Sequence, residues 1–450
     1  MRRDPPVPEN PFMPLLDEYS VFTSLNQRGP LAVLETVDLG RLFTTRHRQW
    51  IEAIGRQELT VTKYRALRSQ IFEFLGITSF RQTAALLDNK EARSACSRRA
   101  CLLLGNMFGI HGTEAEIKAR VGEYARTADA VINSLKTKIF APFASHIAIT
   151  NEVEITTDPV DLLLMIFDDR YHKKARFEAQ RKLSLMSLAG SIDQRERETE
   201  IEEKFSRFLD FLNEQVWSPS LKIGEHDIVY LLSHHRESDF GCDQVRVIRR
   251  QDAEHLAPAP GVKLTLLKRR RFTVNGCDIP IYVSIRKKPP EAKVLKLLRK
   301  NEKNPAVAVD DELGLMAVLN SAADVKIFQK HLTQSATRAN SFMILEDISD
   351  SLTGSRHKAT TAGSSSKTAM LKFFARLGGM RVEFIIHTNR SWVNYLYQRD
   401  VAHDEYEVKR IFDSGVAELL FPPSIYYLNH LEVRDKMIRL CRRQIEDGWL

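Results

Sequence analysis

The hydrophobic period of the sequence changes near residue 226, and this change constrains the fold more than any other feature. Between about residues 39 and 140, apolar residues recur every three or four positions, which is typical of amphipathic helices. After residue 226, short runs rich in β-branched residues predict strands at 227–232, 262–267, 272–274 and 279–285. We therefore expect an α+β protein, in which an all-helical N-terminal half precedes a mixed β-sheet with flanking helices.

Turn, capping and charge patterns predict the remaining elements. Asn275-Gly276 predicts a tight hairpin, Thr113 and Glu116 form a capping box, and a helix begins at Asp158-Pro159. Residues 172–210 are dense in Arg, Lys and Glu and predict one long solvated helix. We expect further helices at 292–303, 322–332 and 428–449, strands at 306–309, 342–345 and 381–386, and a polar loop at 353–367.

Composition is that of an ordinary globular protein of 450 residues, 43% of them hydrophobic. The net charge of +8 favours anionic ligands, but this excess is too small to indicate nucleic acid by itself. The five cysteines are odd in number and lack zinc-ligand spacing, so free thiols in a reducing compartment are expected. The sequence has neither a secretory signal nor an 18-residue apolar stretch, so we expect a cytoplasmic protein without membrane spans.

A basic cluster lies where a predicted strand ends and a helix begins. Arg286, Lys287 and Lys288 end the strand. The following helix adds Lys293, Lys296, Arg299 and Lys300. Side-chain cations and a helix N-terminus together are a common arrangement for holding phosphates. The alternative is a solvated basic surface.

Two carboxylates complete the candidate site. Asp311 follows the apolar run 306–309, and Glu383 lies inside the predicted strand 381–386, between Val382 and Phe384. A charged residue in that position must face solvent, a cavity or a cation. If the two strands are neighbours, Asp311 and Glu383 could share one Mg²⁺ with substrate phosphates. Ordinary placement at a sheet edge is the alternative.

These segments resemble, in order and spacing, the sequence elements of RelA/SpoT-type alarmone synthetases over roughly residues 265–412. Residues 286–292 resemble the Arg-x-Lys-x-x-x-Ser element, with Ala292 at the serine position, and residues 311–314 resemble the Asp-x-x-Gly-x-Arg element, with Met316 at the arginine position. Glu383 resembles the glutamate of the Glu-x-Gln strand, whose glutamine is replaced by Ile385. Residues 402–406 resemble the Ala-His-x-x-Tyr element that follows.

That family transfers pyrophosphate from ATP to the 3′ hydroxyl of GDP or GTP. The resemblance implies that Arg286, Lys288 and Lys293 hold ATP phosphates and that Asp311 and Glu383 bind Mg²⁺. It further implies that Glu383, with His403, acts on the ribose hydroxyl. The family's guanine-stacking tyrosine should fall near residues 363–370, where this chain has no aromatic residue. Loss of a stacking platform forfeits about 1–3 kcal/mol of base binding.

The N-terminal half resembles the HD hydrolase domain of long RelA/SpoT enzymes. Residues 100–117 match one of its segments without a gap, but the metal-binding His-Asp is replaced by Leu104-Gly105 and the following Glu-Asp by Phe108-Gly109. Asp169 and His172 remain from a second element. Hydrolysis requires a metal held by several such ligands, so hydrolase activity is not expected. Helix capping is the preferred role for Asp169 and His172.

The expected organisation has five parts: an extended arm at 1–38, a degenerate HD-like helical domain at 39–210, a connector at 211–264, a synthetase-like nucleotidyltransferase domain at 265–412 and C-terminal helices at 413–450. Two functions fit it. One is a pyrophosphokinase that uses ATP-Mg²⁺ and an unidentified nucleotide acceptor. The other is an inactive homologue that senses nucleotides or regulates a partner. A third hypothesis is an RNA-binding module that uses the basic face, with RNA or the ribosome as partner. The C-terminal helices could pair two copies.

Overall fold

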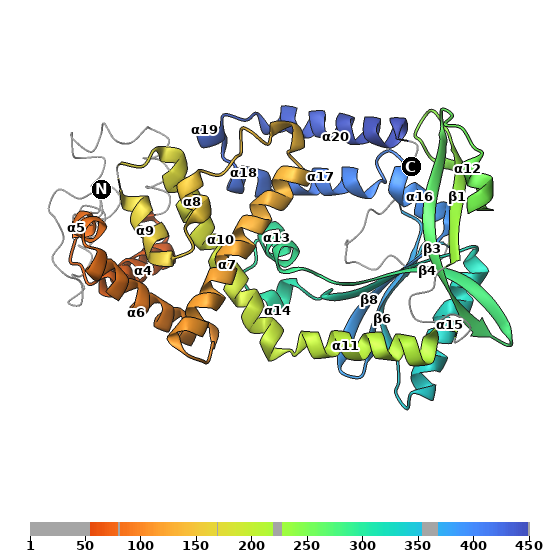
Figure 1. Cartoon of the computed structure of the whole chain (residues 1–450), viewed down its shortest axis with the longest axis horizontal. Helices are drawn as coiled ribbons and strands as arrows, with labels where there is room; N and C mark the ends of the chain where they lie inside the picture. Colours follow the sequence, from red (N-terminus) through yellow and green to blue (C-terminus); the bar gives the residue numbers. More distant parts are fainter. Residues whose placement is uncertain (1–54, 80–81, 169, 219–226, 353–367, 449–450) are drawn as a thin grey trace. The chain divides into compact units, whose positions relative to one another are not determined.

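The computed structural model describes residues 55–79, 82–168, 170–218, 227–352 and 368–448. The chain divides into two compact units, one formed by residues 1–129 and 149–187 and the other by residues 130–148 and 188–450. In the described part of the chain, helices occupy the N-terminal half and a mixed eight-stranded sheet follows (Figure 1). The expected α+β arrangement of a helical half before a mixed sheet is confirmed at this level.

The first unit is helical. Its elements are α4 (Glu58–Leu75), α5 (Thr83–Asp88), α6 (Lys90–Phe108), most of α7 (Glu114–Lys138), α8 (Asn151–Ile155), α9 (Pro159–Phe167) and the first part of α10 (Lys173–Glu198). Phe72 and Leu75 of α4 pack with Cys96 of α6 and Leu164 of α9 in its core. The predicted capping box is present, since Thr113 N–H donates to Glu116 Oε2 and Glu116 N–H donates to Thr113 Oγ1.

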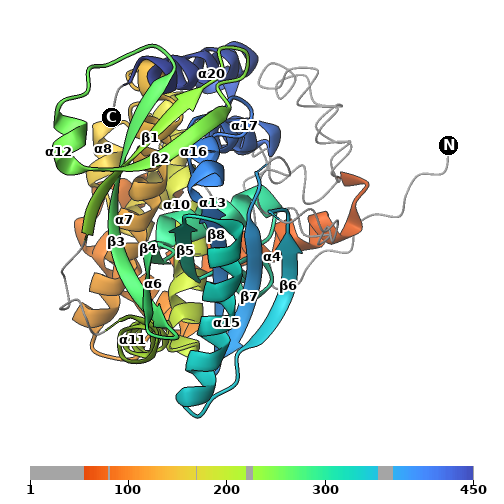
Figure 2. The ribbon, with the colours of Figure 1, turned by 90° about the vertical axis from the view of Figure 1, so that its right-hand side faces the viewer.

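The second unit is built on the sheet, whose strand order is β2-β1-β3-β4-β5-β8-β7-β6 (Figure 2). Neighbouring strands are antiparallel except β5 and β8, which are parallel. The strands are β1 (Asp227–His235), β2 (Cys242–Arg249), β3 (Val262–Val274), β4 (Cys277–Lys287), β5 (Leu313–Leu319), β6 (Ile344–Asp350), β7 (Leu371–Leu377) and β8 (Met380–Thr388).

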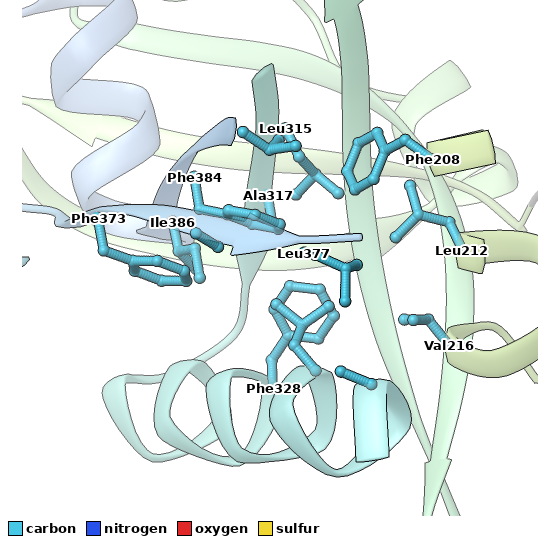
Figure 3. Close-up of a cluster of buried hydrophobic side chains, with 14 of the residues drawn as sticks. Phe208, Leu212, Val216, Leu315, Ala317, Phe328, Phe373, Leu377, Phe384 and Ile386 are labelled. Atoms are coloured by element: carbon cyan, nitrogen blue, oxygen red, sulfur yellow. The ribbon is translucent and has the colours of Figure 1, made fainter. Parts of the chain in front are cut away.

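One face of the sheet carries the main hydrophobic core (Figure 3). Phe208 of α11 (Ile201–Phe211) and Leu212 of η4 (Leu212–Val216) meet Phe328 of α15 (Ala322–Arg338) across strand residues such as Leu315 and Phe384. Side chains alternate between the faces of a strand, so the residues between these core positions point to the opposite face. That second face carries the candidate site.

Helix α16 (Asn389–Tyr397) packs on the second face, where Trp392 and Val393 contact Val318. The other helices of the described residues are η3 (Ala141–Phe143), α12 (Arg250–Glu254), α13 (Pro290–Lys300), α14 (Pro305–Ala308), α17 (His403–Asp413), α18 (Val416–Leu420), α19 (Pro423–Tyr426) and α20 (His430–Asp447). Helices α17 and α20 pack together, and Arg442 on α20 forms an ion pair with the buried Glu405 on α17.

Several predicted elements differ from the structure. Residues 306–309 were expected to form a strand, but Pro305 starts the short helix α14, and Asn304 caps it by accepting from Ala306 N–H. The single helix expected at 172–210 is broken between α10 and α11, where Glu200 has a φ of 51°. Residues 211–264 were expected to be a connector with a strand at 227–232, and they contain a further strand, β2, which pairs with β1 in the same sheet. The expected loop at 353–367 lies outside the described residues.

In the described ranges, no helix combines the length and the apolar character needed to cross a lipid bilayer.

Candidate functional site

The register of three adjacent strands brings the predicted arginine and glutamate together. Arg286 on β4 lies opposite Gly314 on β5, and Gly314 lies opposite Glu383 on β8. A Cβ atom on Gly314 would lie 3.1 Å from Arg286 Nε. The glycine therefore leaves room for the Arg286 side chain to cross β5, and Arg286 Nη2 donates to Glu383 Oε2 at 3.1 Å.

Glu383 is only 5% exposed although it lies in the middle of a strand. Its second oxygen, Oε1, lies 2.9 Å from Lys372 Nζ on β7. Of the three surroundings that the sequence left open for Glu383, which were solvent, a cavity or a cation, the structure has two cations. A buried carboxylate without such partners would carry a large desolvation cost.

Asp311 lies just before β5 and is paired in the same way. Its Oδ2 accepts from Lys288 Nζ at 2.5 Å, and its Oδ1 accepts from Lys296 Nζ on α13 at 2.7 Å. Burial by itself would raise the pKa of Asp311, but the two ammonium groups outweigh it and hold that pKa well below its usual range. Burial lowers the pKa of Lys288, and the charge of Asp311 opposes this effect.

Lys293 is held inside the fold. Its side chain is 1% exposed, and its ammonium lies 2.6 Å from Glu196 Oε1 and 2.7 Å from Glu312 Oε1. The first turn of α13 places it there, one turn before Lys296 on the same helix. Lys293 thus anchors α13 beside the site, whereas the sequence predicted that it would contact phosphate.

The ion pairs continue toward the edge of the sheet. Lys296 also donates to Asp310 Oδ1 at 2.6 Å, and Asp310 lies 3.6 Å from Arg381 on β8. The Arg381 guanidinium lies 3.7 Å from the ring centroid of Phe374, in a cation–π contact, and 3.0 Å from Glu346. Cations and carboxylates therefore alternate across the second face from α13 to β6.

His403, predicted to be catalytic, begins α17 and is 45% exposed. Its ring centroid is 5.3 Å from that of Tyr395, and its Nδ1 lies 3.5 Å from Asp404 Oδ1. Among the contacts of the described residues, none joins His403 to Glu383. Its predicted action on a hydroxyl next to Glu383 stays a prediction.

Tyr395 is an aromatic residue at the site that the sequence analysis missed. Burial raises the pKa of its hydroxyl, and the nearby charge of Arg286 opposes this rise. Its ring stacks on Trp392 with a centroid distance of 5.3 Å. The signal was present in the sequence, because Trp392 and Tyr395 are three residues apart and fall on one helix face directly after β8.

The two synthetase-like positions that have lost their polar residues lie side by side. Met316 on β5, at the arginine position, is directly opposite Ile385 on β8, at the glutamine position. Both are half-buried, and Met316 packs against the cluster that contains Trp392. The second face is therefore charged at the level of Glu383 and apolar two residues further along the strands.

The donor set does not fit a shared Mg²⁺ ion in this arrangement. All four oxygens of Asp311 and Glu383 already face a lysine or arginine side chain. The described part of the chain also contains no group of three or more His, Cys, Asp or Glu side chains arranged to hold a metal. Magnesium requires several oxygen ligands, some from water and some from carboxylate or phosphate, with no competing cation in the same position.

In the helical unit, the positions that resemble metal ligands are apolar. A Cβ atom added to Gly105 would lie 3.2 Å from the Ile117 side chain, so this position has no room for a metal-binding side chain. Phe108 is buried, and its ring packs edge-on against that of Tyr124. His172 caps α10, because its Nδ1 accepts from Ala175 N–H at 3.1 Å. Asp169 lies outside the described residues.

The geometry thus defines a mixed α/β protein with a largely buried cluster of ion pairs on one face of its sheet. No known protein family and no curated protein matches this chain.

A buried histidine four residues beyond Glu383 on β8 gives a testable pH dependence. Burial lowers the pKa of His387 on β8 from 6.5 to about 4. In the folded protein the His387 ring therefore stays neutral, whereas in the unfolded chain it takes up a proton below pH 6.5. The free energy of unfolding should then decrease as the pH drops from 6.5 to 4. The expected loss is about 3 kcal/mol. The measurement is the free energy of unfolding in urea at pH 6.5, 5 and 4.

The variant His387→Gln should flatten this pH profile relative to wild type, and His234→Gln, which changes an exposed histidine of β1, should leave the profile as it is. An unaltered slope in His387→Gln would show that other groups cause the acid destabilisation.

Proposed function

We propose that the sheet-containing unit binds a nucleoside polyphosphate, with ATP as the first ligand to test, on the second face of β4, β5 and β8. The observation that carries this proposal is the cluster around Asp311 and Glu383, in which the cations Lys288, Lys296, Arg286 and Lys372 face three carboxylates, since Lys296 also pairs with Asp310, and one positive charge is left over. Arg286 is 53% exposed while Glu383 holds it in place. An exposed, pre-ordered guanidinium is well suited to phosphate.

The RelA/SpoT resemblance supports a more specific proposal, that the protein is a divergent member of that family acting in guanosine tetra- and pentaphosphate metabolism. In this proposal, residues 39–210 are a degenerate HD-like domain and residues 265–412 a nucleotidyltransferase-like domain. GDP and GTP are then further ligands. A cytoplasmic location and pairing of two copies through the C-terminal helices belong to the same proposal.

Nucleotide binding in a sensing or regulatory role fits the site better than group transfer. Both oxygens of Glu383 already accept from cations, so neither is directed at a ligand hydroxyl. The apolar pair Met316 and Ile385 offers no hydrogen bond to a second nucleotide. Transfer of pyrophosphate from ATP remains the second candidate. It is supported by the parallel pairing of β5 with β8, because this pairing places Gly314 and Glu383, each from a synthetase-like sequence element, directly opposite each other.

Calorimetric titration of the full chain with ATP, GTP and guanosine tetraphosphate tests the binding function. We expect at least one of them to bind, with an affinity that decreases as salt increases, because the contacts are ionic. RNA of mixed sequence serves as a competitor in the same buffer. If the folded protein binds none of the three nucleotides, the proposal is contradicted. If it binds RNA more tightly than the nucleotides, RNA binding takes the place of nucleotide binding as the function.

A second experiment separates binding from transfer. The chain is incubated with ATP labelled in its terminal phosphates, Mg²⁺ and a panel of nucleotide acceptors. The binding role predicts intact ATP and no labelled acceptor. Appearance of label on an acceptor would establish the second candidate instead.

A further inference from the structure

We propose that this site binds the polyphosphate directly and without a divalent cation, the ammonium and guanidinium groups of Lys288, Lys296, Arg286 and Lys372 taking the place of the metal. This inference rests on the proposed function and specifies how that site works. It departs from the sequence-based expectation of ATP-Mg²⁺. The ligand class is a metal-free polyphosphate, either inorganic or the tail of a nucleotide.

The pairing of each oxygen carries the proposal. In Asp311, Oδ2 faces Lys288 at 2.5 Å and Oδ1 faces Lys296 at 2.7 Å. In Glu383, Oε2 faces Arg286 at 3.1 Å and Oε1 faces Lys372 at 2.9 Å. A lysine or arginine nitrogen therefore lies within 3.1 Å of every carboxylate oxygen that a shared metal would use.

These cations are fixed and would not leave easily. The side chains of Lys288 and Lys296 are almost fully buried. The backbone N–H of Lys288 donates to Glu312 O, and Lys296 is held by α13, whose Val294 and Leu297 are fully buried. A Mg²⁺ ion at Asp311 would have to displace two ammonium groups that remain within a few ångströms of it, and like charges at that distance repel strongly.

The charge balance favours the free ligand over its metal complex. Four cations against three carboxylates, Asp310 included, leave the cluster with one positive charge. Free triphosphate carries more negative charge than its Mg²⁺ complex, so it interacts more strongly with such a cluster. Magnesium should then act as a competitor that sequesters the ligand, whereas in a metal-dependent site it is required.

The test is a calorimetric titration of the full chain with inorganic tripolyphosphate and with ATP, each in EDTA and in excess Mg²⁺. We expect binding in EDTA and an affinity about tenfold lower in Mg²⁺. Binding that requires Mg²⁺ would overturn this inference and leave the proposed function intact. Failure of both ligands under both conditions would overturn the proposed function, and this inference with it. Binding of tripolyphosphate alone would support the metal-free mode but not a nucleotide.

Isosteric variants separate a metal ligand from an ion-pair partner. Asp311→Asn removes the charge that competes with phosphate for Lys288 and Lys296, so metal-free affinity should rise by about threefold or more. If Asp311 were a metal ligand, the same change would instead abolish Mg²⁺-dependent binding. If Asp311→Asn does not fold, Glu383→Gln replaces it, because it removes the charge that competes with phosphate for Arg286 and Lys372. Glu254→Gln, at an exposed carboxylate of α12, is the control and should leave the affinity unchanged.

Discussion

Replacing Lys293 by methionine should lower the free energy of unfolding by about 3–5 kcal/mol, which is the largest effect on stability expected at the site. Methionine retains most of the apolar volume of the side chain but removes the charge. Glu196 and Glu312, which lie 2.6 and 2.7 Å from the ammonium, would then face each other without a cation. Breaking a buried pair by removing one partner costs about this much.

Urea unfolding followed by circular dichroism measures the effect. Lys326→Met is the control, since it makes the same change at an exposed position of α15, and it should alter stability by less than about 0.5 kcal/mol. The triple variant with Glu196→Gln and Glu312→Gln should recover most of the loss. A loss below about 1 kcal/mol in Lys293→Met would mean that the pairs are not formed in solution.

Replacing Arg286 by methionine should weaken polyphosphate binding by about 10- to 100-fold, because one charge-assisted contact is worth about 1.5–3 kcal/mol. Stability should change by less than about 1 kcal/mol, since Glu383 keeps its contact with Lys372 and Arg286 is half-exposed. Calorimetry gives the affinity, and urea unfolding gives the stability of the same preparation.

Arg286→Lys should recover part of the affinity, because lysine supplies the charge but not the planar fork of donors. Arg250→Ala, at an exposed arginine of α12 that pairs with Glu254, is the control. Equal loss of affinity in Arg250→Ala and Arg286→Met would indicate that only the overall charge of the protein matters. Unchanged affinity in Arg286→Met would remove this residue from the site.

Part of the fold was predictable because its signals are local. The hairpin at Asn275-Gly276, the strand that became β8 and the helix α15 are each defined by turn chemistry or by a clear period. Strand β5, Leu313–Leu319, was missed because it is a continuous apolar run containing Leu, Met and Ala, which also suits a buried helix. Strand β2 is an edge strand with exposed charges on both faces and shows no alternation.

The sequence pointed to several residues of the candidate site, but not to Lys372 or Tyr395 and not to the pairing of the charges. The order of Arg286, Asp311 and Glu383 along the chain indicated a charged site. Which cation meets which carboxylate depends on strand register, on the small size of Gly314 and on the way α13 returns over the end of β4. These are tertiary features. For that reason the sequence predicted a metal shared by Asp311 and Glu383, whereas in the structure lysine and arginine side chains face both carboxylates.

The most direct test of the account is a crystal structure of the full chain with ATP or tripolyphosphate bound. The account predicts phosphate oxygens within about 3 Å of the Arg286 guanidinium and the Lys288 ammonium, on the face of β4, β5 and β8 opposite Phe384. Phosphate bound elsewhere on the protein, with the pairs around Asp311 and Glu383 unchanged, would contradict it.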